Sequence, residues 1–279
     1  MPRPPTMPDM PAFFDTHAHL DFPEFAADLE SVRTRAREAG ISRILTIGCD
    51  HESSCRAIAL AEKYPEIYAV VGWHPTHVMD APADVRPALR ELARHPRVVA
   101  IGEAGVDHYR LPSQQPGGTT ADDERYRQKQ IEVFSQQLDV AADLGLNVVV
   151  HQRAAWAATV AAIRPYQGRV RGVFHCFSEP LPALAEVLAM DCLVSFTGIL
   201  TFKNGQNIRA ALDATPMGRF MLETDCPFLA PVPYRGKRCE PAFVKEIAQT
   251  AAEVKGVSLE ELSRATCETA ENFFRFDRR

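Results

Sequence analysis

Eight short apolar runs, rich in β-branched residues, recur along the chain and alternate with longer segments of helical pattern. The runs are AFFDTH, SRILTIG, IYAVVGW, VVAIGEAG, NVVVH, RGVFHC, CLVSFTG and RFMLETD. Most are almost continuously apolar, as strands covered on both faces are. Eight strand–helix repeats in 279 residues predict an α/β fold, a (β/α)8 TIM barrel, although alternation alone is also compatible with a doubly wound open sheet.

The segments between the runs carry helix signals. In residues 123–145, Ile131, Phe134 and Leu138 fall on one helical face, and a glycine follows at the expected end. The tail SLEELSRATCETAENFF opens with Ser258 and Glu261 in the spacing of a capping box, which predicts an extra C-terminal helix.

No linker or composition shift divides the chain, so we expect a single domain over residues 1–279, with residues 1–11 flexible. The segment RLPSQQPGGTTADDER, residues 110–125, is rich in Gly, Pro, Ser and Thr, and it predicts a long mobile loop after the fourth strand.

Composition narrows the class of protein. The formal charge of −5 argues against a surface that coats nucleic acid, but it leaves room for a local basic site. Seven dispersed cysteines are typical of free thiols in a reducing compartment. No signal peptide and no apolar run of membrane-spanning length is evident. We therefore expect a cytoplasmic protein with no membrane association and no obligate protein partner.

Metal-binding side chains gather at the ends of the predicted strands. Carboxylates there include Glu103, Asp107 and Asp225, and seven of the nine histidines lie at or just past strand ends: His17, His19, His74, His77, His108, His151 and His175. A single histidine after a strand is usually structural. The carboxyl ends of barrel strands form one rim, however, so convergence from five strands predicts a metal site there.

The number of candidate ligands suggests two ions. His17 and His19 are two residues apart and on a strand point the same way, so they can bind one ion together. One catalytic zinc needs only three protein ligands, whereas six candidates are available: His17, His19, Glu103, His151, His175 and Asp225. We expect two divalent ions (Zn, Mg, Mn, Co or Fe) sharing a carboxylate, which suits phosphodiester hydrolysis well and ester or amide hydrolysis acceptably.

Several motifs together resemble the TatD family of metal-dependent deoxyribonucleases, within the metal-dependent hydrolase superfamily of TIM barrels. They occur in order from about residue 13 to 274: DTHAHLD, GWHP, AIGEAGVD, NVVVHQRAA, GVFHCFS, SFTGILTFKN and LETDCPFLAPVPYRGKRCEPAF. The last block is long and distinctive. The resemblance implies hydrolysis of DNA, often from the 3′ end, while some family members act on RNA or on aminoacyl-tRNA esters.

The resemblance also implies roles for individual residues. Glu103 would bridge the metals, Asp225 would be the general base for the attacking water, and His74 would lie near the substrate phosphate or leaving group. The first metal would be held by His17, His19, Glu103 and Asp225, and the second by Glu103, His151 and His175.

Basic residues near the predicted rim are candidates for contacts with substrate phosphates. They are Arg153, Lys203, Arg235, Lys237 and Arg238. Phosphate contacts position a nucleic acid without reading its bases, so we expect weak sequence specificity.

The sequence departs from the family pattern at four positions. Cys239 stands where Asn is usual, His108 replaces a usual Tyr, and HPTH replaces HPH, which leaves the role of His77 open. Trp73 replaces a small aliphatic residue and either stacks on a base or packs at the rim.

Three neighbours of the expected ligands have competing interpretations. Cys176 and Cys226 each follow a ligand, and packing behind the barrel is favoured over metal binding because adjacent strand residues point to opposite faces. Glu223 either orients a ligand histidine or fills the barrel floor.

Two other classes of function compete with a nuclease. One is another hydrolase, either an esterase acting on aminoacyl-tRNA or an amidohydrolase acting on a C–N bond. Ring-amide hydrolases of the superfamily often carry a modified lysine where this chain has Glu103, which counts against them. The other is a non-enzymatic metal-binding scaffold, which the complete ligand set disfavours.

Overall fold

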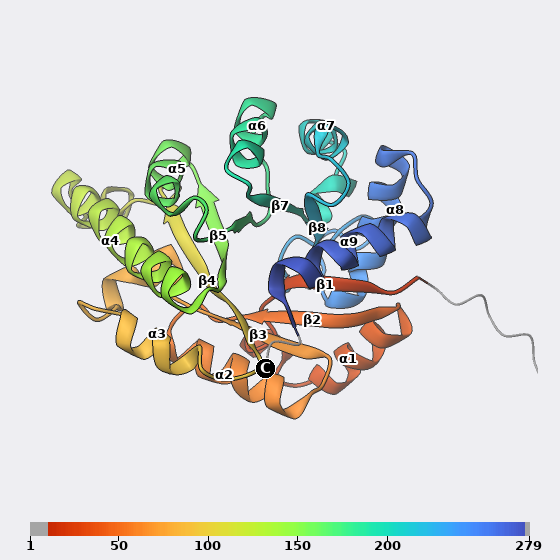
Figure 1. The fold of residues 1–279 in the computed structure, drawn as a ribbon, viewed down its shortest axis with the longest axis horizontal. Helices are drawn as coiled ribbons and strands as arrows, with labels where there is room; N and C mark the ends of the chain where they lie inside the picture. The colour runs from red at the N-terminus through yellow and green to blue at the C-terminus, as the bar shows by residue number, and fades with distance from the viewer. Residues whose placement is uncertain (1–10, 277–279) are drawn as a thin grey trace, which may run out of the picture.

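The computed structural model describes residues 11–276, and its centre is one eight-stranded sheet. The strands follow one another in sequence order, each parallel to the next, with helices around the outside (Figure 1). They are β1 Phe13–Ala18, β2 Ile41–Ile47, β3 Ile67–Val71, β4 Val98–Asp107, β5 Asn147–Arg153, β6 Gly172–Phe174, β7 Leu193–Phe196 and β8 Phe220–Leu222. The order from one to eight never reverses, which confirms the (β/α)8 prediction and excludes the doubly wound alternative.

Eight of the nine described α-helices, α1 to α8, cover the outer face of the sheet, and α9 lies across its floor. The nine are α1 Leu29–Glu38, α2 His51–Lys63, α3 Arg86–Leu92, α4 Thr120–Leu144, α5 Trp156–Ile163, α6 Leu181–Ala189, α7 Gln206–Ala214, α8 Val244–Lys255 and α9 Leu259–Phe274. Glycines 145 and 256 end α4 and α8 with positive φ, as the sequence predicted. Within residues 11–276, no helix is long and apolar enough to span a membrane.

Alternate residues of each strand face two different cores, as a two-residue period requires. Phe13, Ile44 and Val148 pack outward with the helices. Their neighbours Leu45 and Val149 belong to a second buried cluster inside the barrel. This interior cluster fills the barrel floor and leaves the carboxyl ends of the strands to carry polar side chains.

Helix α9 closes the floor of the barrel, which confirms the predicted extra C-terminal helix. Ser258 caps its start by accepting a hydrogen bond from the Glu261 N–H. Phe273 and Phe274 of this helix and the following Phe276 belong to the interior cluster. The Phe276 ring lies 4.6 Å from that of Tyr68, so the end of the chain packs under the strands.

The first and last strands meet through only a few bonds. Ala18 and Cys226 form an isolated bridge, and the Asp225 N–H donates to the His17 carbonyl at 2.8 Å. The Thr16 hydroxyl donates to the Leu222 carbonyl at 3.1 Å. The barrel therefore closes beside the residues that the sequence marks as metal ligands.

Among the predicted boundaries that the structure corrects, two bear on the loops around the site. Residues 120–125 are not loop but the start of α4, because Thr119 and Asp122 form a capping box with reciprocal hydrogen bonds. The eighth strand ends at Leu222 rather than at residue 225, and Asp225 has a left-handed backbone with φ 57°. Residues 1–10 and 277–279 are outside the described residues, and with them nearly all of the segment expected to be flexible.

Candidate metal centre

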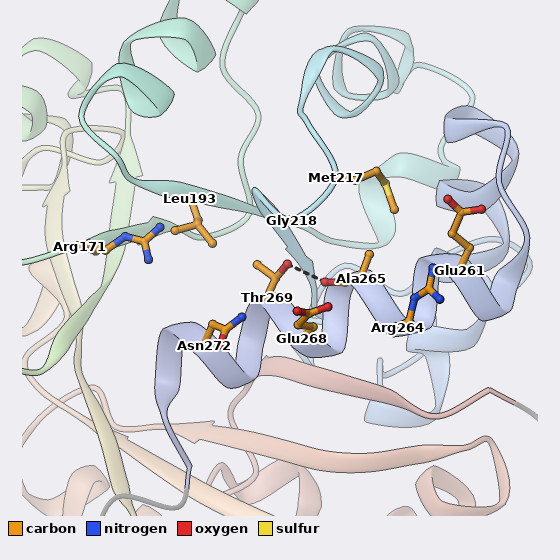
Figure 2. A pocket seen from close by; sticks show the side chains of 10 residues that line it. All are labelled: Arg171, Leu193, Met217, Gly218, Glu261, Arg264, Ala265, Glu268, Thr269 and Asn272. Carbon is orange, nitrogen blue, oxygen red and sulfur yellow. Dashed lines mark hydrogen bonds between the residues drawn. The ribbon is translucent and has the colours of Figure 1, made fainter.

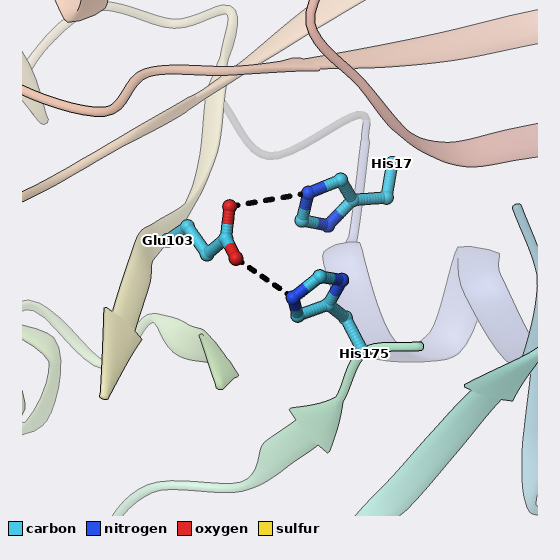
Figure 3. Close-up of side chains that lie close together, drawn as sticks. All are labelled: His17, Glu103 and His175. Carbon is cyan, nitrogen blue, oxygen red and sulfur yellow. Dashed lines mark ion pairs between the residues drawn. The ribbon is translucent and has the colours of Figure 1, made fainter. Parts of the chain in front are cut away.

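All six candidate ligands meet at the carboxyl ends of the strands, around Glu103. His17 lies on β1 and Glu103 within β4, where the pairing with β5 shifts register. His151 lies on β5, His175 follows β6, and Asp225 follows β8. Figure 3 shows one oxygen of Glu103 facing His17 and the other facing His175, at 3.3 and 2.7 Å.

The two oxygens of Glu103 divide the cluster into two sides. Oε2 faces His17 at 3.3 Å and His19 at 3.8 Å, and Asp225 Oδ1 lies 3.5 Å from the same His19 nitrogen. Oε1 faces His151 at 2.6 Å and His175 at 2.7 Å. A carboxylate with one oxygen on each side is arranged to bridge two cations.

The residues present fit a metal ion. Both ring nitrogens of His17 are buried and lack a hydrogen-bond partner among residues 11–276, an arrangement that is costly unless another group satisfies them. Three-residue sets with ligand atoms within 4.8 Å of one another include His17 with Glu103 and His175, and His17 with His19 and Asp225. Imidazole and carboxylate groups at this spacing match divalent transition metals.

Outer residues orient the histidines. Asp107 Oδ2 lies 3.1 Å from His151 Nε2, so His151 Nδ1 is left to face Glu103. The Ile47 carbonyl lies 3.2 Å from His19 Nδ1, so Nε2 carries the free lone pair. Such outer partners fix the tautomer of a ligating histidine.

Glu223 lies beside His175, the third histidine with such an outer partner. Its Oε1 lies 3.6 Å from His175 Nδ1 and accepts a hydrogen bond from the Cys176 N–H at 2.7 Å. This placement favours an orienting role over filling the barrel floor.

The electrostatics set the charge of each group. Burial opposes ionisation of Glu103, but His175, together with the hydrogen bond to His151, outweighs it and holds the carboxyl pKa well below its usual range. Burial likewise opposes ionisation of Asp225, while the hydrogen bond with His19 keeps its pKa low. Both carboxylates are thus ionised at neutral pH, as metal ligands must be.

The histidines fall into two groups. Burial lowers the pKa of His17, and it lowers the pKa of His74 to about 3, so both are neutral. Burial also opposes protonation of His19, His151 and His175, but neighbouring groups, carboxylates among them, outweigh it and raise their pKa. A metal ion that binds this cluster would therefore displace protons.

His74 lies at the edge of the cluster in a defined tautomer. Its Nδ1 accepts the Thr76 N–H at 3.1 Å, so Nε2 carries the hydrogen. That nitrogen faces His151 Nδ1 at 3.3 Å and Glu103 Oε1 at 3.5 Å. A neutral N–H pointing into the site is suited to donating a hydrogen bond.

Asp15 is a residue that the sequence analysis did not single out. Its buried carboxyl accepts hydrogen bonds from the Thr224 N–H at 2.9 Å, the Thr224 hydroxyl at 2.6 Å and the His17 N–H at 3.3 Å. It ties the backbone before Asp225 to the strand that carries His17. No local signal marks it, because its main partner is 209 residues away.

Cys49 was also not anticipated. It follows β2, is buried, and forms a three-residue ligand set with His19 and Glu103. Its Sγ lies 3.6 Å from His19 Nδ1. The expectation for Cys226 is consistent with its complete burial, and neither it nor Cys176 enters a ligand set among the described residues.

The predicted phosphate-binding residues lie around the mouth of the barrel, and they differ in what their side chains contact. Arg153 lies over the Tyr109 ring and Arg235 over the Phe202 ring, each at 3.6 Å. Lys237 lies 5.9 Å from the Tyr234 ring, and Lys203 is exposed. Arg238 instead pairs with Asp28 at 2.7 Å, which ties the last rim loop to the start of α1.

The four departures from the family pattern lie around rather than inside the cluster. Trp73 is 4% exposed, which favours packing over base stacking. Cys239 is fully buried and its N–H donates to the Pro227 carbonyl at 3.0 Å, so it packs beneath the loop. His77 turns outward to Asp50 at 3.2 Å, and half-buried His108 donates its N–H to the Arg153 carbonyl.

A surface groove at the opposite end of the barrel is separate from this cluster (Figure 2). It lies between α9 and the residues at the amino ends of β6, β7 and β8. Its charged lining side chains are two arginines and two glutamates, Arg171, Arg264, Glu261 and Glu268, with no histidine or cysteine among them. The concentration of metal-ligand groups at the other end identifies that end as the chemical site.

A (β/α)8 barrel with converging histidines and carboxylates at its carboxyl rim is the architecture of a metal-dependent hydrolase. Residues 14–275 match the family model described as TatD related DNase. The chain therefore belongs to the TatD family of metal-dependent hydrolases, as the sequence motifs indicated.

Individual relatives agree with this assignment. An uncharacterized metal-dependent hydrolase of Bacillus subtilis, YabD, is 36% identical over 265 residues, which cover 95% of this chain and 99% of the relative. A protein of Erwinia tasmaniensis named 3′-5′ ssDNA/RNA exonuclease TatD is 34% identical over 268 residues, 94% of this chain and 99% of that one. The crystal structure of YJJV, a TatD homologue of Escherichia coli, is similar with a TM-score of 0.86, 25% identity and coverage of 95% and 99%.

Proposed function

We propose that the protein cleaves phosphodiester bonds in DNA, as a 3′-to-5′ exonuclease on single-stranded ends that also accepts RNA. The observation that carries the proposal is the gathering of six ligand side chains around Glu103, with one carboxylate oxygen toward each side. Relatives at 34% identity carry the name 3′-5′ ssDNA/RNA exonuclease, which supports nucleic acid as the substrate.

Two divalent ions fit the cluster. His17, His19, Glu103 and Asp225 would hold one ion, and Glu103, His151 and His175 the other. When bound, such ions polarise a phosphoryl oxygen and lower the pKa of the attacking water. The histidines suit Zn, Mn, Co or Fe, and the carboxylates also allow Mg.

Asp225 is the proposed general base. Its side chain is 15% exposed, compared with 3% for Glu103, so it is the ligand carboxylate that water and substrate can reach. Its low pKa keeps it ionised and able to accept a proton from the attacking water.

His74 and the basic rim residues would hold the substrate. The Nε2–H of His74 points into the site and would donate to a phosphate oxygen or to the leaving group. The phosphates further along the strand would contact Arg153, Lys203, Arg235, Lys237 and Arg238. Since Arg238 is already paired with Asp28, we expect it to contribute least.

The decisive measurement is a substrate screen with several metals. End-labelled single-stranded DNA, duplex DNA, RNA and aminoacyl-tRNA are compared with Mg, Mn, Zn and Co. We expect release of mononucleotides from the 3′ end of single strands. Hydrolysis of aminoacyl-tRNA alone would instead identify the esterase alternative.

Replacing Asp225 with Asn tests the proposed base. We expect kcat to fall about 10²- to 10⁴-fold, the usual contribution of general base catalysis, while Glu268→Gln in the distant groove serves as a charge-matched control. Metal-dependent cleavage that stays near the wild-type rate in Asp225→Asn would show that this role is wrong.

The thiols support a cytoplasmic location. All seven cysteines are free, which is the usual state in a reducing compartment, and we place the protein in the cytoplasm as one domain that acts without an obligate partner.

A further inference from the structure

An aromatic pair lies beside the candidate metal centre and is not explained by the fold or by the ligand set. Phe22 follows β1 and Phe228 follows β8, so both lie at the mouth of the barrel. The Phe22 ring stacks on His19 at 4.7 Å with an interplanar angle of 23°. The Phe228 ring meets Phe22 edge to face at 6.2 Å and lies 6.4 Å from His19.

The pair is accessible to a ligand. Phe228 is 50% exposed, and it belongs to neither of the two buried apolar clusters of the described residues. Phe22 is partly buried against His19. Half of the Phe228 side chain faces solvent beside a candidate ligand histidine, so its ring is placed to pack against an apolar surface that the substrate itself supplies.

Other rim aromatics differ in one respect. Arg153 covers the Tyr109 ring and Arg235 covers the Phe202 ring, so those sites present a cation to an anionic group. In the described part of the chain, no arginine or lysine is placed over Phe22 or Phe228. An uncharged aromatic surface recognises a flat, apolar face rather than a phosphate.

The geometry points to Phe22 and Phe228 as a stacking platform for the nucleobase of the terminal nucleotide that the metal centre releases. This inference rests on the proposed nuclease function and specifies its substrate site. Base–aromatic stacking accepts every base because each has a π face, so the platform would select an unpaired terminal base without selecting its identity. A base in a duplex is already stacked and paired, and is therefore disfavoured.

The test compares two single-stranded oligonucleotides, one ending in a normal 3′ nucleotide and one ending in an abasic tetrahydrofuran nucleotide. For the wild-type enzyme we expect kcat/KM to be about 5- to 160-fold higher for the base-bearing end, the range of one base stacked on an aromatic ring. In Phe228→Ala this preference should collapse to within about twofold, and Phe228→Trp should restore it.

Two controls keep the result specific. Leu144→Ala removes an exposed apolar side chain at the far end of α4 and should keep the wild-type preference. Phe22→Leu keeps packing against His19 but removes the aromatic face, so it should reduce the preference as well. A preference that persists in Phe228→Ala, or a wild-type enzyme that cuts both ends equally, overturns the platform. Failure to release nucleotides from either oligonucleotide would instead overturn the proposed function.

Discussion

Asp15 illustrates how a single buried carboxyl can hold a site together without touching the reacting groups. It accepts three hydrogen bonds and joins β1 to the segment that positions Asp225. Burial raises the pKa of this carboxyl to about 8, against the hydrogen bonds from Thr224 that lower it. At neutral pH the group is therefore largely protonated in the metal-free protein.

We predict that Asp15→Asn is tolerated and Asp15→Ala is not. An asparagine amide can accept from the Thr224 N–H and donate to the Thr224 hydroxyl, so it replaces the protonated acid. Alanine leaves buried donors unpaired, at about 1–3 kcal/mol each, and frees the segment before Asp225. Urea denaturation and kcat together check this, and equal stability of the two variants would contradict it.

The same carboxyl predicts a pH dependence. Between pH 3.8, its ordinary pKa, and about 8, the folded chain holds a proton that the unfolded chain has lost. Stability contributed by this group is therefore complete below that window and decreases as pH rises through it. We expect the metal-free wild type to lose stability relative to Asp15→Asn between pH 5 and 8, measured by denaturant unfolding. A difference that is constant over this range would count against the raised pKa.

The convergence of the candidate ligand residues could be predicted from the sequence, whereas the contacts around them could not. His17, Glu103 and Asp225 have the chemistry of ligands and follow or lie in apolar runs, so local pattern is enough. The pairing of Arg238 with Asp28 joins residues 210 apart. No local pattern distinguishes such a paired arginine from one that is free to bind phosphate.

At the scale of elements, a helix or strand could be predicted when the residues that determine it lie within its own segment of the sequence. The number and order of the strands follow from periodicity, and α9 from its cap. The length of β8 does not, because Thr224 leaves the ladder to bond with Asp15 on another strand. The start of α4 was missed because its capping box uses Asp122 in place of the more usual glutamate.

Helix α9 should stabilise the barrel without affecting chemistry. Phe274 is 1% exposed and packs in the barrel floor, at the end opposite the candidate metal centre. We expect Phe274→Ala to cost about 3–5 kcal/mol of unfolding free energy and to leave kcat of the folded enzyme within about twofold. Denaturant unfolding and kinetics on the same preparation test this, and a large fall in kcat with unchanged stability would contradict it.

At the scale of the whole molecule, the candidate metal centre lies where the barrel closes. His17 and His19 come from one side of the seam and Asp225 from the other. In the proposed ligand set one ion would draw its ligands from both ends of the sheet, so we expect metal binding and barrel closure to be coupled.

Removing the metal should therefore lower the melting temperature. A ligand present at 100 times its Kd stabilises the folded state by about 2.7 kcal/mol, so dialysis against a chelator should reduce Tm and readdition of Zn or Mn should restore it. Calorimetry with elemental analysis of the same samples measures both the shift and the number of ions. A Tm that is independent of metal content would contradict the coupling.

The contact between the first and last strands also determines which stages of synthesis and folding can contain a complete site. Asp15 and Thr224 are 209 residues apart, and the ligands on either side of them meet only when the last strand has joined the first. A nascent chain, or one cut before its last strand, carries His17 without Asp225 and cannot complete the cluster. Under the proposed function, a chain that lacks its last strand would therefore have no complete metal centre, and we expect it to leave the substrate uncleaved.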